Sequence, residues 1–197
     1  MKKLFVFAAA ACFCFAANAQ DFKFAHVNVT ELIQLMPEMD AAREQIDAAG
    51  KEASDTYQAM VDEFQSKYST YEQKQSTWTA AVKESKEKEL GEINQRIQEF
   101  QQAIQQELQQ QQNELMEPIQ KKAMDTVNSI AKAKGCIYVF DVQSVLYVDP
   151  SKSIDITPDA RKALNIPADR TLEALYKELQ EKQQAQQAAA GAQQQQP

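Results

Sequence analysis

The sequence predicts an α+β fold that is mainly α, in which a long antiparallel helical hairpin projects from a small β-rich body. Two observations predict it. Residues 38–134 carry apolar residues at steps of three and four, which is the pattern of helices with one apolar stripe. Short runs rich in β-branched and aromatic residues lie on both sides of that stretch. Because the core outside the hairpin is small, we expect self-association to stabilise it.

The first nineteen residues have the features of an export signal. Lys2 and Lys3 precede an apolar run from Leu4 to Ala17, and Ala17-Asn18-Ala19 is a typical cleavage site. We therefore predict a signal peptide over residues 1–19 and cleavage after Ala19. Lipid attachment at Cys12 is the alternative, which the missing upstream leucine disfavours.

Charge and cysteine content exclude several classes of protein. The formal net charge is −7, and it becomes about −9 without the two lysines of the signal. An acidic chain lacks the basic face of a nucleic-acid binder. No later segment is apolar enough for stable membrane insertion. Cys136 is the only cysteine after the signal, which excludes an internal disulfide and favours a buried thiol over an intermolecular bridge.

The body begins with residues 20–37. The run from Phe22 to Val29 is rich in aromatic and β-branched residues and predicts a strand. Thr30 is expected to cap a short helix from Glu31 to Met36, which Pro37 ends.

The arm is predicted over residues 38–134. Residues 75–82 have the poorest helix propensity of the region, so we expect the tip of the hairpin near 76–84. In the second helix the apolar stripe from Leu90 to Ile130 repeats every 3.6 residues or so, which predicts a nearly straight helix. Pro118 should bend that helix locally, and Gly135 should end it.

Residues 135–166 are expected to complete the discontinuous body. They contain two apolar runs that predict strands, 136–142 and 145–148. Thr157 and Pro158 mark the start of a short helix. An extra amphipathic helix is predicted within 167–182, and the Gln/Ala-rich residues 183–197 are expected to be disordered.

No constellation of catalytic residues is apparent, so we expect no enzyme. His26 lies in a predicted strand without a cysteine or carboxylate at ligand spacing, and is interpreted as a packed structural residue. Asp141 follows an apolar strand, where a turn or a structural hydrogen bond is favoured over an acid catalyst. The sequence has no phosphate-binding loop and no metalloprotease motif.

Three segments together resemble the Skp/OmpH family of periplasmic chaperones. They are FAHVNVTELIQLMPE at 24–38, ELMEPIQKKAMDTV at 114–127 and YVFDVQSVLYVDPSKSIDIT at 138–157. The resemblance covers about residues 22–164. It implies a periplasmic homotrimer whose three arms hold unfolded outer-membrane proteins, without nucleotide or any other cofactor. Members of the family are basic, whereas this chain is acidic, which argues against lipopolysaccharide as a partner.

Two sets of candidate residues follow from this interpretation. The oligomerisation body would use apolar residues of its strands, namely Phe24, Val27, Ile137, Val139, Val145 and Tyr147. Clients would contact aromatic residues of the arm, namely Tyr57, Phe64, Tyr68, Tyr71, Trp78 and Phe100. Packing between the two helices is the alternative role of these aromatic residues.

Many weak contacts between flexible arms and an unfolded chain would sum to tight binding without ATP. The alternative function is a structural coiled-coil spacer or adaptor of the cell envelope, which would bind one folded partner.

Overall fold

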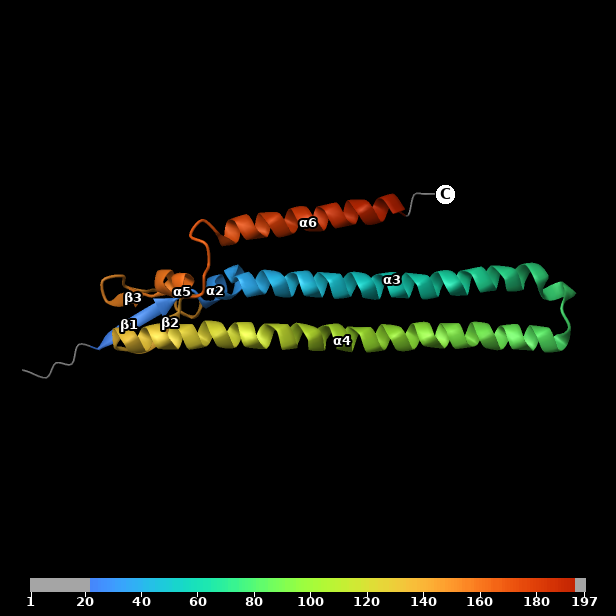
Figure 1. Ribbon diagram of the computed structural model, residues 1–197, viewed down its shortest axis with the longest axis horizontal. Coiled ribbons are helices and arrows are strands. Elements are labelled where there is room, and N and C mark those ends of the chain that lie inside the picture. Colours follow the sequence, from blue (N-terminus) through green and yellow to red (C-terminus); the bar gives the residue numbers. More distant parts are fainter. Residues whose placement is uncertain (1–21, 194–197) are drawn as a thin grey trace, which may run out of the picture.

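In the computed structural model, which describes residues 22–193, two long helices leave a small body and run side by side to a tip at the far end (Figure 1). In chain order the elements are β1 (Lys23–Val27), α2 (Val29–Leu35), α3 (Pro37–Lys74), the 3-10 turn η2 (Gln75–Thr77), α4 (Ala80–Lys134), β2 (Cys136–Asp141), the 3-10 turn η3 (Val142–Ser144), β3 (Ser153–Asp155), α5 (Thr157–Ala163) and α6 (Leu172–Gln193). This architecture confirms the predicted mainly-α α+β fold. The predicted signal peptide, 1–19, lies outside the described residues.

The tip of the arm is tighter than predicted. Helix α3 ends at Lys74, and α4 already begins at Ala80, so residues 80–84 are helical and not part of the turn. Thr79 accounts for the difference, because its hydroxyl accepts a hydrogen bond from the Val82 amide at 3.4 Å and caps the new helix. A residue of low helix propensity here starts a helix.

Helix α4 runs unbroken for 55 residues, which corresponds to about 80 Å. It continues through Pro118, and Figure 1 shows no sharp kink along its length. It ends at Gly135, which adopts the left-handed conformation with φ 71°. Glycine adopts that conformation without steric cost, which explains the stop.

The sheet has three strands in the order β2-β1-β3, and both pairings are parallel. Phe24 lies opposite Tyr138 on one side and Ser153 on the other. The third strand is therefore Ser153–Asp155, and the prediction of a strand at 145–148 is wrong. Leu146 and Tyr147 of that segment are exposed, because the chain loops away from the sheet there.

One face of the sheet packs on helices to form the core. Ala25 and Val27 of β1 are buried on this face, together with residues of α2, the base of the arm and α5. The largest fully buried side chains are Leu32, Leu35, Met36, Ile156, Leu164 and Val27. The core thus joins the body to the first turns of α3 and the last turns of α4, and it fixes the direction in which the arm leaves.

Two helix starts differ from their predicted caps. Helix α2 begins at Val29, and its cap is Asn28, whose side chain accepts from the Glu31 amide at 3.0 Å. Thr157 is the first residue of α5 and not its cap. Its buried hydroxyl accepts a hydrogen bond from the Asn28 amide at 3.1 Å and so connects α5 to the start of α2.

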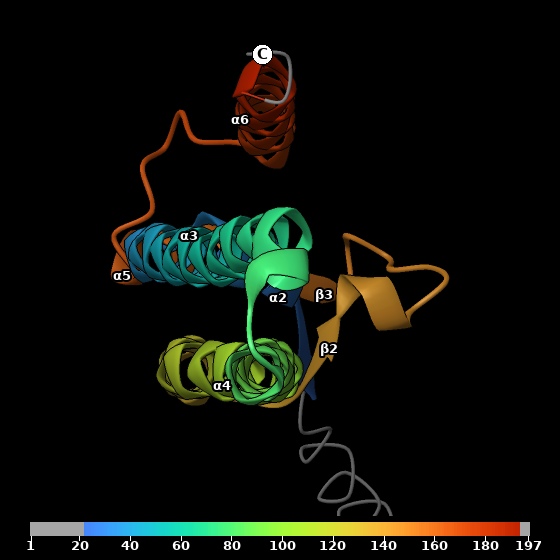
Figure 2. The same ribbon diagram turned by 90° about the vertical axis from the view of Figure 1, so that its right-hand side faces the viewer.

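Helix α6 extends well beyond the predicted boundary at residue 182. It continues to Gln193, so the prediction of disorder from residue 183 is wrong for residues 183–193. Alanine and glutamine both favour helix, and a helix already nucleated by packing extends through them readily. Leu175 is buried and anchors α6 to the body, and Arg170 pairs with Asp40 of α3 at 2.5 Å. Figures 1 and 2 show α6 directed along the arm as a separate third rod.

Candidate functional site

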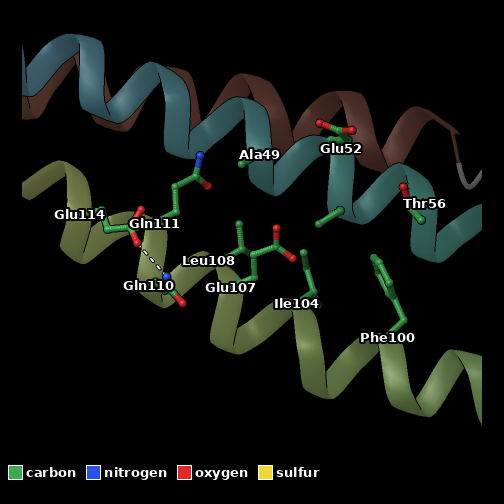
Figure 3. A pocket seen from close by; sticks show the side chains of 11 residues that line it. Ala49, Glu52, Thr56, Phe100, Ile104, Glu107, Leu108, Gln110, Gln111 and Glu114 are labelled. Atoms are coloured by element: carbon green, nitrogen blue, oxygen red, sulfur yellow. Dashed lines mark hydrogen bonds between the residues drawn. The ribbon is translucent and has the colours of Figure 1, made fainter.

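The middle of the arm is a groove and not a closed seam. A cavity of about 720 Å³ lies between α3 and α4, and Figure 3 shows side chains from both helices around it. Its apolar lining comes from Ala49 and Ala53 of α3 and from Phe100, Ile104 and Leu108 of α4. The two alanines are too small to fill the space opposite the larger residues. All five apolar side chains are consequently only half-buried.

Packing is looser in this section than at the base of the arm. Along α3 the only buried residues are Met39 and Ala42, close to the body. Along α4 no residue is fully buried between Ile93 and Ile119. Apolar side chains that stay accessible over a long stretch can contact another polypeptide without prior unfolding of the arm.

Ion pairs join the two helices on both sides of the groove. Lys122 pairs with Glu38 near the body, and its hydrogen bond holds the pKa of the Glu38 carboxyl below its ordinary value. Beyond the groove, Arg96 lies 3.2 Å from Glu63. Among the described residues, no ion pair between α3 and α4 occurs in the section between these two.

A further network of charges holds the distal part of the arm. Lys67 of α3 contacts Glu89 of α4, and Lys86 lies 2.8 Å from the same carboxylate. These hydrogen bonds, of which that from Lys67 is the stronger influence, lower the pKa of Glu89 to about 2. Ion pairs therefore join α3 to α4 near the body and toward the tip, and the groove lies between these two sets of pairs.

The predicted client-facing aromatic residues divide into two groups. Phe100 lines the groove, and Tyr57 lies in the same section of the arm, next to the lining residue Thr56, whereas the other four lie on the distal arm or at its tip. There, Phe64 stacks on Tyr68 with a centroid distance of 6.0 Å, and Trp78 meets Tyr71 edge-on at 5.9 Å. Each of these four rings therefore packs partly against a neighbouring ring of the arm. Tyr57, Phe64, Tyr71, Trp78 and Phe100 are half-buried, and Tyr68 is 45% exposed.

A second candidate surface is the face of the sheet that none of the helices within residues 22–193 covers. Phe24, Tyr138 and Phe140 form an aromatic cluster on it, with ring centroids 6.2 to 6.5 Å apart. Tyr138 is 61% exposed and Phe140 is 44% exposed. His26 shares this face, where its Nδ1 lies 2.8 Å from the Ser153 hydroxyl. Purely parallel sheets are normally covered on both faces, so this open aromatic face is unusual for a free surface.

Comparisons with known proteins agree with this architecture. The family described as outer membrane protein (OmpH-like) matches residues 23–164, which include the sheet and the whole arm. The chain belongs to the OmpH-like family. A search of curated proteins finds no significant match.

The solved structure of an OmpH-like protein from Caulobacter crescentus, described as an outer membrane chaperone, superposes with a TM-score of 0.66 at 14% identity. The alignment covers 76% of this chain and 90% of that one. This likeness supports the shared fold. The family match ends at residue 164, so α6 lies beyond the region that defines the OmpH-like family.

The six predicted body residues of this OmpH-like protein do not share one surface. Val27 is buried and Val139 is packed against its core, so both stabilise the single chain. Phe24 belongs to the open aromatic face, and Tyr147 is 79% exposed in the loop after η3. Ile137 is half-exposed in β2, and Val145 is half-buried in the loop. Cys136 is half-buried beside the core.

Sequence reasoning missed the aromatic pair Tyr138 and Phe140. The signal was present, because these residues alternate with Ile137 and Val139 along β2, and alternation assigns them to the opposite face of a strand. Phe22 and Phe24 alternate in the same way before and within β1.

Two kinds of site are absent from the described part of this OmpH-like chain. Between residues 22 and 193, no group of three or more histidine, cysteine or acidic side chains could hold a metal ion. None of the helices over the same residues combines the length and apolar character that a bilayer crossing requires.

Proposed function

We propose that this OmpH-like protein is an ATP-independent holdase of the periplasm. It binds unfolded outer-membrane β-barrel proteins between the arms of a homotrimer and prevents their aggregation. The observation that carries this proposal is the groove in the middle of the arm, where apolar side chains of both helices remain accessible. Membership of a family that includes an outer membrane chaperone supports it.

The groove suits an unfolded client and not a small ligand. Unfolded barrel proteins expose alternating apolar residues and unpaired strand edges, both of which aggregate. The apolar side chains of the groove are half-buried between the two helices, so each can offer a client only part of its surface and each contact is weak. Several such contacts on several arms add up to useful affinity, and a client leaves when folding in the membrane is more favourable.

The open aromatic face of the sheet supports the assembly of the arms. Tyr138 and Phe140 present apolar surface on this face that a second copy would remove from water. Phe22, Leu146 and Tyr147 of the body are also exposed. The outer edges of β2 and β3 also carry no strand partner among the described residues. The number of three subunits rests on the resemblance to Skp/OmpH chaperones.

Aggregation of a denatured outer-membrane barrel, followed by light scattering after dilution from urea, tests the proposal. The protein without residues 1–19 should suppress scattering in the absence of ATP at about one trimer per client. Ile104→Ser combined with Leu108→Ser should weaken suppression. Met124→Ser is the matched control, because Met124 is 45% exposed on α4 outside the groove.

Undiminished aggregation beside the wild-type protein would contradict the holdase function. Binding of a single folded envelope protein, without any effect on unfolded barrels, would instead favour the spacer or adaptor.

A further inference from the structure

Acidic residues are concentrated in the same section of the arm as the groove. The section comprises residues 44–62 of α3 and 97–117 of α4, which face each other between the pairs Glu38–Lys122 and Glu63–Arg96. It contains one basic residue, Lys51, which lies 2.6 Å from Asp55. Its acidic residues are Glu44, Asp47, Glu52, Asp55, Asp62, Glu99, Glu107, Glu114 and Glu117.

The other sections of the arm are balanced in charge. Near the tip, five lysines alternate with glutamates between residues 67 and 92, and several pair with them. Near the body, Lys121, Lys122, Lys132 and Lys134 offset the acids around them. The negative charge of the mature chain, about −9, thus lies mostly in the middle of the arm.

Three of the carboxylates line the groove itself. Glu52 approaches it from α3, and Glu107 and Glu114 approach it from α4 (Figure 3). Glu114 accepts a hydrogen bond from Gln110 at 2.7 Å, which leaves its charge unneutralised. Glu52 and Glu107 form no ion pair with any described residue. The groove therefore combines an apolar lining with an acidic rim that has no cation of its own.

We propose that this groove selects segments of unfolded clients in which lysine or arginine flanks apolar residues. This inference rests on the proposed holdase function and deepens it by naming the class of segment. An apolar side chain of the client replaces water over Phe100, Ile104 and Leu108, while a neighbouring cation approaches the carboxylates. An acidic segment meets like charge at the same place and is rejected.

Polypeptide is the occupant that the surroundings favour. Glutamines from Gln101 to Gln112 flank the groove on α4 and offer both donors and acceptors to an exposed backbone. A long arm lined in this way matches an extended chain better than it matches a compact ligand.

Two labelled peptides of about twenty residues test the selection. Both carry the same alternating apolar residues, but one has lysines and the other glutamates at the remaining positions. Fluorescence anisotropy with the full mature protein measures their affinities at low and high salt. We expect the cationic peptide to bind about tenfold more tightly or better at low salt, and salt to remove most of the difference.

Substitution of the rim locates the effect. Glu52→Gln, Glu107→Gln and Glu114→Gln together should weaken binding of the cationic peptide by about tenfold, since each exposed pair contributes roughly twofold. Glutamine and glutamate have similar helix propensity, so circular dichroism should be unchanged. The matched control is Glu72→Gln, Glu84→Gln and Glu92→Gln, which removes the same charge near the tip and should leave the affinity within about twofold.

Three results would overturn the inference. They are equal affinity for both peptides, equal loss in the rim and control variants, and a changed subunit number in the rim variant, which would assign the groove to a second copy of the chain. If barrels are protected but the peptides bind equally, only the charge selection fails. If the cationic peptide binds but barrels still aggregate, the holdase function fails.

Discussion

Replacing Tyr138 by serine should dissociate the assembly that the open aromatic face supports. Tyr138 is 61% exposed, and an aromatic side chain presents about 150–250 Å² of surface in total. About 90–150 Å² is therefore available to a second copy, which corresponds to about 2–4 kcal/mol per subunit at roughly 25 cal/mol per Å². Summed over three subunits, the variant loses at least about 7 kcal/mol of assembly free energy.

That loss has a measurable consequence for the assembly. A loss of about 7 kcal/mol raises the dissociation constant of a trimer about 10⁵-fold. That constant has units of concentration squared, so the protein concentration at which half of the chains are assembled rises by its square root, about 300-fold. Sedimentation velocity over a dilution series of about a thousandfold resolves such a shift. The matched control is Tyr176→Ser, because Tyr176 is 53% exposed on α6, away from the sheet. A Tyr138→Ser protein that assembles like the wild type would refute the reasoning, as would a monomeric wild type.

Three further predictions concern the arm and the third helix. Gly135→Ala should lower the free energy of unfolding in urea by about 1–2 kcal/mol, because φ is 71° there. Gly50→Ala should raise it by about 1 kcal/mol, because Gly50 lies inside α3 with open space for a Cβ. Equal effects of the two substitutions would contradict the assigned backbone conformations. The depressed pKa of Glu89, about 2, means that its contact with Lys67 stabilises the arm fully above the ordinary pKa of 4.5 and is lost as pH falls toward 2. Glu89→Gln should remove this part of the pH dependence of amide exchange in the distal arm, and an unchanged profile would argue against the contact. Leu175→Ala should cost about 2–5 kcal/mol of packing and release α6, so limited proteolysis should cut the 165–171 linker faster, and unaltered cleavage would show that α6 is held elsewhere.

The long helices were predictable from sequence because their signal is repeated over many turns. Each apolar residue from Leu90 to Ile130 adds to one periodic pattern, so a polar residue at one position does not change the prediction of a helix. The stop at Gly135 was equally predictable, because glycine adopts the left-handed conformation that a helix end requires.

The third strand could not be found from composition. The 145–148 segment has the residues that favour strands, yet Leu146 and Tyr147 are exposed and pair with nothing in the described chain. The actual strand, Ser153–Asp155, has one apolar residue and is defined by its backbone pairing with β1. Composition reports which side chains tolerate a strand, whereas pairing depends on where a distant segment lies.

The groove could not be predicted from the sequence either, although its apolar residues belong to the predicted stripes of the two helices. Phe100 was a candidate for client contact, but the gap beside it exists only because Ala49 and Ala53 lie opposite. The acidic rim depends in the same way on the facing of two helices more than forty residues apart in sequence. The pattern along one helix predicts which residues form its apolar stripe. The register between two helices decides whether the residues of that stripe are buried by the partner helix or left accessible.

The pairing of β1 with β2 has a consequence for how the chain folds. Residues 28–135 separate the two strands, and closing a flexible loop of that length costs about 4 kcal/mol in entropy. Contacts so distant in sequence are expected to form slowly if the chain searches for them at random. The hairpin avoids that search, since zipping α3 against α4 from the tip brings β1 and β2 together step by step. A protein exported from its N-terminus would hold β1 unpaired until almost the entire arm has emerged, and the arm would then serve as the template on which its own body assembles.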